Sequence, residues 1–181
     1  MFRLRIFKDA KHFFLRSLLL KKKLSTDEES LDLSSAIFNM GTVCLKLNET
    51  DDALVYLEKA KQIHSKIDSD SLQAAEVCSQ LGSLYVQLKQ YDEAMREIYT
   101  AFSIRTKKLD SSNEDICATC HHIANVCYQQ EMFDKAHLFY SFALDNAVSV
   151  ELQGHIFHGL GNTYTKINDD EKAGMSSIFP L

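Results

Sequence analysis

Residues 78–101 read CSQLGSLYVQLKQYDEAMREIYTA, and this stretch decides the fold. Its small and apolar residues fall into two groups, Leu81-Gly82 with Tyr85, and then Ala94, Ile98 and Ala101. Within each group, spacings of three, four and seven residues place the side chains on one face of an α-helix. The stretch therefore predicts two helices, with a turn just before Tyr91.

The same pattern returns along the chain. Four segments align on a shared alanine and a weaker fifth follows: Phe7-Lys-Asp-Ala10, Thr50-Asp-Asp-Ala53, Tyr91-Asp-Glu-Ala94, Phe133-Asp-Lys-Ala136 and Asp170-Glu-Lys-Ala173. The alanines are 43, 41, 42 and 37 residues apart, and a period of this size is typical of solenoids. Twelve residues before the last four alanines stand small residues, Gly41, Gly82, Ala124 and Gly161. We expect these where two helices cross, because a larger side chain would push the axes apart.

The composition agrees with an all-helical chain. Its 181 residues include 6 Gly and 1 Pro, which argues against hairpin-rich sandwiches, barrels and Rossmann-type sheets. Hydrophobic residues make up 45% and charged residues 25%, so the chain is not of the disordered class. The longest apolar run, residues 13–20, contains Arg16 and is too short to span a bilayer, so we expect no membrane span.

These residues resemble the tetratricopeptide repeat family, whose pattern is a Leu-Gly pair and a Tyr, followed by Ala, Phe or Tyr, and Ala. The resemblance covers nearly the whole chain. It implies an all-α, right-handed superhelical solenoid of antiparallel helix pairs, with about three full repeats and partial repeats at both ends. The period of 41–42 residues exceeds the family's usual 34 and is similar to kinesin light chains. The final unit, from Glu151 to Tyr164, looks more like the polarity scaffolds that bind G-protein alpha subunits.

The register sets the expected boundaries. The predicted units are a partial repeat at 1–28 (a second helix only, with a basic face), repeats at 29–69, 70–112 and 113–148, and a divergent partial repeat with a tail at 149–181. The helices are expected at about 7–24, 29–47, 51–66, 72–88, 91–108, 114–130, 133–147 and 150–166, with a stub from 170. Capping boxes at Ser25-x-x-Glu28 and Thr26-x-x-Glu29, and Ser112 before the acidic Glu114, indicate helix starts.

Charge is unevenly distributed. Residues 1–23 carry +7 and residues 24–181 carry −12, and an acidic body argues against nucleic acid as a partner. We interpret the basic segment as a truncated repeat helix; a mitochondrial presequence and a membrane-surface or partner-binding helix are the alternatives.

We expect the chain to be a fragment, a shortened isoform or a divergent member of the family. Its open ends, with Phe14 and Phe179, are then expected to associate end to end. Five cysteines suggest reduced thiols in the cytoplasm. By analogy with the family in its repeat style, we expect a setting in motor, cytoskeletal, ciliary or polarity complexes.

Residues 117–121 read CATCH, which matches the C-x-x-C-H motif of covalent haem attachment. Together with His122 and Cys127, the same cysteines and histidine are also candidate zinc ligands. We favour a core role, because Cys120 takes the register position of Ile37, Cys78 and Phe157. There is no second C-x-x-C, and His155 and His158 lie a whole repeat away. No catalytic constellation stands out, so we expect no enzyme activity, no cofactor and no metal.

The resemblance implies that ligands lie in a concave groove lined by the first helix of each repeat. The expected groove residues are Phe38, Asn39, Thr42 and Leu45; Ser79, Gln80, Ser83 and Val86; His121, His122, Asn125 and Tyr128; and His158, Asn162 and Thr165. Amide side chains bind both N–H and C=O of a peptide backbone, and histidines would make binding pH-sensitive. The basic clamp that holds a terminal carboxylate in some co-chaperones is missing. We therefore expect an adaptor for a peptide or helix of another protein, with end-to-end assembly as the alternative.

Overall fold

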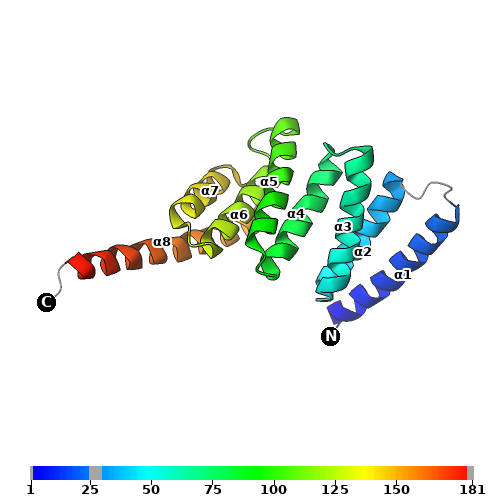
Figure 1. The fold of residues 1–181 in the computed structure, drawn as a ribbon, viewed down its shortest axis with the longest axis horizontal. Helices are drawn as coiled ribbons and strands as arrows, with labels where there is room; N and C mark the ends of the chain where they lie inside the picture. Colours follow the sequence, from blue (N-terminus) through cyan, green and yellow to red (C-terminus); the bar gives the residue numbers. More distant parts are fainter. Residues whose placement is uncertain (1, 25–29, 179–181) are drawn as a thin grey trace. The chain divides into compact units, whose positions relative to one another are not determined.

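The computed structural model describes residues 2–24 and 30–178, with side chains at 5–21, 23 and 30–168, and its described residues form eight α-helices and no strand (Figure 1). The helices are α1 (Phe2–Leu24), α2 (Leu31–Lys46), α3 (Thr50–Ile67), α4 (Leu72–Gln87), α5 (Tyr91–Lys108), α6 (Glu114–Gln129), α7 (Phe133–Asn146) and α8 (Val150–Ile178). The all-α prediction is confirmed. The chain divides into two compact units, Met1–Lys89 with α1 to α4 and Gln90–Leu181 with α5 to α8.

In the first unit, α2 and α3 form a closely packed pair, with α1 against α2 and α4 against α3. Ala53, Leu57 and Ala60 are fully buried on α3. A Cβ atom added at Gly41 of α2 would lie only 2.8 Å from Leu57 Cγ. The close crossing therefore needs a residue without a side chain, as the register predicts.

The second unit repeats this arrangement around α6 and α7. Ala136, Tyr140 and Ala143 of α7 are buried, and so are Cys120 and Ala124 of α6. Helix α5 packs on α6, and α8 packs on both α7 and α6. The buried guanidinium of Arg105 in α5 donates to the hydroxyl of Thr119 in α6 at 2.6 Å. This hydrogen bond links α5 to α6 within the core.

The turns before α3, α5 and α7 share one conformation. Asn48, Lys89 and Glu131 each have a positive φ, at 62°, 59° and 60°. The N–H of Glu49 donates to the Cys44 carbonyl, and that of Met132 to the Cys127 carbonyl, both at 2.9 Å, which closes the preceding helix with a left-handed cap. The helices after these turns begin at Thr50, Tyr91 and Phe133, so the predicted turn positions are confirmed.

Helix starts are set by side chains close to the predicted ones. The hydroxyl of Ser30 accepts from the N–H of Leu33 at the start of α2. The predicted capping boxes at Ser25 and Thr26 lie outside the described residues. At α6 the cap is Asn113 rather than Ser112, because the Asn113 Oδ1 atom accepts from the N–H of Asp115 at 2.9 Å.

The two terminal helices differ from the prediction. Helix α1 already begins at Phe2, so no turn precedes the segment at Phe7. Helix α8 runs without a break to Ile178, so the predicted end at 166 and the separate stub from 170 are wrong. No Gly or Pro lies between 162 and 173 to stop the helix, and the single Gly174 costs only about 1 kcal/mol relative to Ala.

The prediction for the last repeat also fails in its packing. A Cβ atom at Gly161 would meet nothing within 4 Å, so this glycine marks no helix crossing among the described residues. The close approach is instead at Gly159, where a Cβ atom would overlap the ring of Tyr140. Phe157, expected in the core, is 59% exposed. In the repeats formed by α2 with α3 and by α6 with α7, the residue at this register position is buried, and the second helix of the repeat packs against the first. No described residue after α8 forms such a helix.

Candidate functional site

A polar cluster joins α6, α7 and α8 within the second unit. The ring of His121 in α6 stacks on that of His155 in α8, with centroids 6.1 Å apart and an angle of 24° between the planes. The ring of Tyr140, which reaches over from α7, lies 5.9 Å from the ring of His121. Side chains from three helices therefore converge on one point.

Hydrogen bonds fix the orientation of this cluster. The hydroxyl of Tyr140 donates to Asn125 Oδ1 at 2.5 Å, and Asn125 Nδ2 lies 3.3 Å from His121 Nε2. Tyr140 can reach this place because Gly159 of α8 has no side chain to fill it. The amide of Asn125 is thereby held between the phenol of Tyr140 and the imidazole of His121. These contacts fix the orientation of all three side chains.

The cluster borders a cavity of about 270 Å³. Its lining residues carry amide, imidazole, phenol or no side chains, and are His121, Asn125, Tyr128, Gln129, Tyr140, His155, His158, Gly159 and Asn162. No Lys, Arg, Asp or Glu is among them. The cavity can therefore exchange hydrogen bonds with a neutral polar group, and has no fixed charge to pair with an ion.

Burial keeps His121 and Tyr140 neutral at physiological pH. Loss of hydration lowers the pKa of His121 to about 4, and the neighbouring His122 and His155 act in the same direction. Burial also raises the pKa of Tyr140 to about 12, so its hydroxyl remains a donor. A neutral imidazole has one donor and one acceptor nitrogen, which suits it to a peptide backbone.

Comparison with known proteins identifies the repeats. The sequence model of the tetratricopeptide repeat family matches residues 32–96, which span α2, α3, α4 and the start of α5. Residues 32–96 are tetratricopeptide repeats. Among curated proteins, no sequence match was found.

Solved structures extend the likeness over the whole fold. BtubC (BKLC) from P. vanneervenii is 16% identical, with a TM-score of 0.81 over 93% of this chain and 69% of that one. Two crystal structures of TPR-like repeats of a protein from Podosopora anserina, assigned as a kinesin light chain, are each 15% identical. They have TM-scores of 0.77 and 0.76 and cover 93% of this chain and 82% of theirs. At sequence identities of 15–16%, the similarity of these structures shows that the chain shares their fold. The shared fold consists of tetratricopeptide-like repeats similar to those of kinesin light chains.

The cavity brings together most of the groove residues predicted in α6 and α8. His121, Asn125, Tyr128, His158 and Asn162 line it. His122 and Thr165 do not, and the hydroxyl of Thr165 donates to the carbonyl of Gly161.

Sequence reasoning missed Gln129, Tyr140, His155 and Gly159. The spacing 155, 158, 159 and 162 marks one helical face and could have revealed the two on α8. His155 lies a whole repeat after His121 in the sequence, but the two rings meet in space because α8 packs directly on α6.

In the first unit, the predicted groove residues lie on α2 and α4, which pack against each other. Asn39 is exposed. The half-buried ones are Phe38, Thr42, Leu45, Gln80, Ser83 and Val86. Ser79 is buried, contrary to the prediction. Phe38 and Leu45 pack against the core of this unit, which accounts for their low exposure.

The cysteines of the CATCH string do not fit a haem or zinc site. Cys117, Cys120 and Cys127 are buried free thiols. Burial raises the pKa of Cys120 to about 12 and also raises the pKa values of Cys117 and Cys127, so the thiolates that a metal needs are disfavoured. In the repeat they act as small apolar core residues.

Sequence reasoning also missed a cluster of Cys44, Glu49 and Asp52, whose ligand-type atoms lie within 4.8 Å of one another among the described side chains. The ammonium of Lys11 from α1 pairs with the carboxylates of Glu49 and Asp52, and it lies 3.3 Å from Asp52 Oδ2. Desolvation raises the pKa of Cys44 to about 11. This cluster therefore holds α1 in place through a lysine, and its thiol stays protonated.

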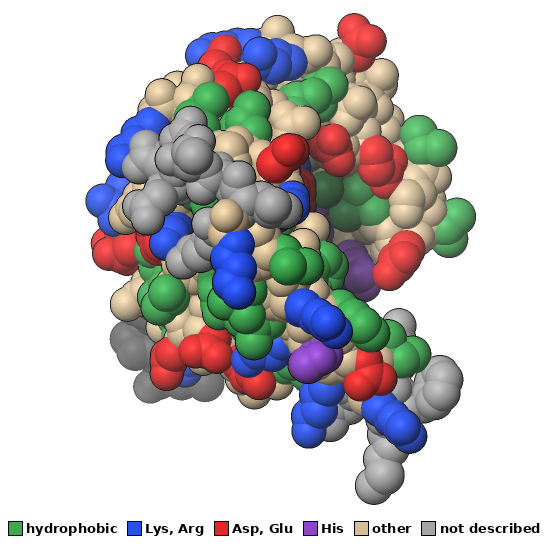
Figure 2. Space-filling view, turned by 90° about the vertical axis from the view of Figure 1, so that its right-hand side faces the viewer, with side chains coloured by type: hydrophobic (Ala, Val, Ile, Leu, Met, Phe, Trp, Pro, Cys, Tyr) green, Lys and Arg blue, Asp and Glu red, His purple; other side chains and the backbone are tan. Residues whose placement is uncertain are grey.

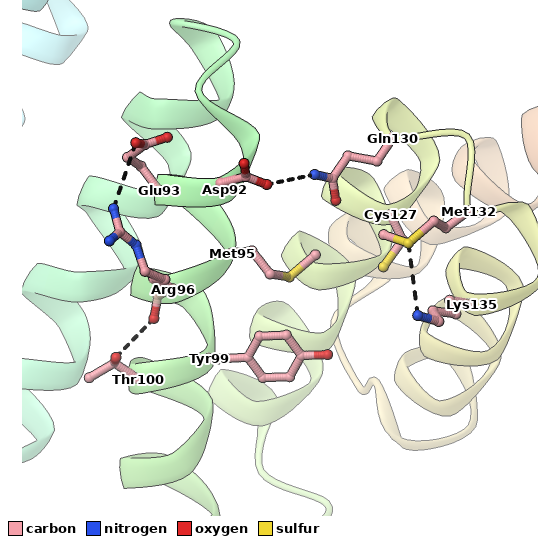
Figure 3. Close-up of a pocket in the computed structure, with 10 residues that line it drawn as sticks. All are labelled: Asp92, Glu93, Met95, Arg96, Tyr99, Thr100, Cys127, Gln130, Met132 and Lys135. Atoms are coloured by element: carbon pink, nitrogen blue, oxygen red, sulfur yellow. Dashed lines mark hydrogen bonds and ion pairs between the residues drawn. The ribbon is translucent and has the colours of Figure 1, made fainter.

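A second, larger hollow of about 860 Å³ lies in the second unit between α5 and α7, with α6 as its floor (Figure 3). Met95, Tyr99 and Met132 supply its apolar surface. Part of its charged rim is paired internally: Asp92 accepts from the Gln130 amide at 3.2 Å, and Glu93 lies 3.7 Å from Arg96. Unlike the cavity at His121, this hollow is lined by charged side chains.

In the described part of the chain, every helix is too short or too polar to cross a lipid bilayer.

Proposed function

We propose that this chain is a non-catalytic scaffold that holds an extended segment of a partner protein against α6 and α8. Tetratricopeptide repeats are protein-interaction modules, and this chain has their fold. The observation that carries the proposal is the cavity at His121, whose lining offers only neutral hydrogen-bonding groups. Such a lining fits a polypeptide backbone, which is itself neutral and carries donors and acceptors.

The chemistry of the lining selects among possible ligands. The amides of Gln129 and Asn162 can each donate to a carbonyl and accept from an N–H group. A terminal carboxylate or a phosphate would require a cationic partner, which the lining lacks. The proposed ligand is therefore an internal segment of a partner chain, bound through its main chain.

The cellular setting is part of the same proposal. The solved repeats that this chain resembles include those of a protein assigned as a kinesin light chain. By analogy, we place this scaffold in the cytoplasm, in complexes of the cytoskeleton, the cilium or cell polarity. The analogy rests on fold alone, so the binding experiment below is independent of it.

Selection from a library of short displayed peptides, followed by calorimetry with the best binder, tests the site. Asn162→Ala removes an exposed amide that lines the cavity, and we expect it to weaken binding about tenfold, since one to two hydrogen bonds are lost. Asn168→Ala is the matched control, because Asn168 is an exposed residue of α8 outside the cavity lining. Equal affinities for the two variants would refute the assignment.

A further inference from the structure

A stripe of alternating large and small residues is exposed along α8. It consists of Val150, Gly154, Phe157, Gly161 and Tyr164, at spacings of four, three, four and three residues. The three large side chains are 82%, 59% and 56% exposed. The spacing keeps all five on one helical face, distinct from the face that lines the cavity. At one end of the stripe, Tyr164 packs against the ring of His137 in α7, and its hydroxyl lies 2.7 Å from His137 Nε2. The open part of the stripe therefore runs from Val150 to Gly161, and an exposed apolar surface of this kind often marks an interaction site.

The corresponding stripes of two other first helices, α2 and α6, are covered. On α2 the equivalent residues are Ser34, Ile37, Gly41 and Cys44, and on α6 they are Cys117, Cys120, Ala124 and Cys127; all eight are buried. Their partners are α3 and α7.

The glycines of α2 and α8 differ in whether a second helix packs against them. Leu57 of α3 fills the notch at Gly41, where a Cβ atom would be 2.8 Å from it. The equivalent notch at Gly161 is open, and nothing lies within 4 Å of a Cβ atom there. Among the described residues, no second helix packs against α8 at Gly161, and the surface there is open.

Helix α1 carries a matching stripe. Ile6, Ala10, Phe13, Ser17 and Leu20 follow the same spacing of four, three, four and three, and again alternate large with small. Ile6, Phe13 and Leu20 are 49%, 67% and 54% exposed.

The residues in register with this stripe, at the start of α3 and along it, are Glu49, Ala53, Tyr56, Ala60 and Ile63. Ala53, Ala60 and Ile63 are buried, so part of the α1 stripe corresponds to the buried side of α3.

Charge also distinguishes the two helices. The sequence of α1 carries a net charge of +7, whereas that of α8 carries −2. Arg5, Arg16 and Lys23 are exposed on α1, and the helical spacing places them along one edge of its apolar stripe. Figure 2, which views the molecule from the side of α1, shows Lys and Arg side chains among hydrophobic ones. Two copies of α1 would repel each other, while α1 and α8 attract.

We propose that α8 of one copy binds the exposed stripe of α1 of a second copy. The large side chains of each stripe enter the notches beside the small residues of the other, with Gly161 as the central notch. The contact is head to tail and leaves one free end on each copy, so it adds further copies rather than closing at a dimer. A single pair of helices forms a small interface, and we expect affinity in the range of tens of micromolar.

Sedimentation velocity of the full chain at rising concentration tests this proposal. The wild type should increase in mass without reaching a plateau. Phe13→Glu destroys the stripe on α1 and Phe157→Glu destroys that on α8, so each variant alone should stay monomeric. Leu138→Glu is the matched control: Leu138 is an apolar residue of α7, 67% exposed and outside both stripes, and its replacement should leave association unchanged.

Mixing the two variants gives the decisive result. Phe13→Glu retains an intact α8 and Phe157→Glu retains an intact α1, so an equimolar mixture should form a dimer and nothing larger. Recovery of the dimer also shows that both variants fold. A wild type that stays monomeric, a single variant that still associates, or a mixture that stays monomeric would overturn the proposal.

Discussion

At the scale of single residues, Gly159 determines whether the cavity can exist. The ring of Tyr140 occupies the space where any side chain at position 159 would lie. In Gly159→Ala the added methyl group must displace this buried ring, and with it the hydroxyl that donates to Asn125. We expect a loss of about 1–3 kcal/mol in the free energy of unfolding, measured by urea denaturation.

Gly154→Ala is the control for this change. A Cβ atom at Gly154 meets nothing within 4 Å, so the substitution should be neutral or stabilise α8 by up to about 1 kcal/mol. If both substitutions had the same effect, the close packing of Gly159 and Tyr140 would not contribute to stability.

The half-buried imidazole of His121 makes stability depend on pH. Its pKa is about 4 in the folded chain and 6.5 without burial, so between these values the unfolded chain binds a proton that the folded chain does not. Stability should therefore fall as the pH drops from about 6.5 to 4, by up to about 1.4 kcal/mol per pH unit. The pKa of His64 in α3 is also lowered by burial, so it adds to the same trend.

Urea denaturation at several pH values, compared for the wild type and His121→Gln, measures this contribution. The variant cannot take up the proton and should lose stability less steeply in acid. His12→Gln replaces an exposed histidine of α1 and controls for the removal of one imidazole. An unchanged slope in His121→Gln would show that His121 is solvated rather than desolvated in the fold.

At the scale of helices and turns, the repeated left-handed turn carries a local cost. Glu131 has φ of 60°, a conformation that costs a residue with a Cβ atom roughly 1 kcal/mol and costs glycine nothing. Glu131→Gly should raise the melting temperature by a few degrees. Asn48→Gly should change it less, because asparagine already tolerates this conformation. A lower melting temperature in Glu131→Gly would contradict the assignment of this strain.

The sequence predicted the helices of the complete repeats well, because their signals are local. The spacing around Ala53, Ala94 and Ala136 locates three helix faces, and all three alanines are fully buried. It failed at α8, where the register placed a turn before Asp170. In the other repeats the helix after the turn buries an apolar face, whereas Gly174, Ser176 and Ser177 offer none. Without that gain, continuing the helix is the favoured outcome.

The candidate site was predicted only in part, because it depends on contacts between helices. Spacing identifies which residues of α6 and α8 share a face, and five of those predicted line the cavity. It does not show that Tyr140, a core residue by register, extends its hydroxyl past the core to Asn125. Nor does it show that His155 stacks on His121, since that contact joins residues of two different repeats.

At the scale of the whole molecule, the five cysteines are distributed through both units and all are buried free thiols. Burial raises the pKa values of Cys44 and Cys120 to about 11 and 12, and only the thiolate reacts rapidly with aromatic disulfides. The native chain should therefore react slowly at neutral pH, and five thiols per chain should appear after unfolding in denaturant. Fewer than five would reveal a disulfide or a covalent group. A fast native thiol would show that one repeat opens locally, and replacing each cysteine by alanine in turn would identify it.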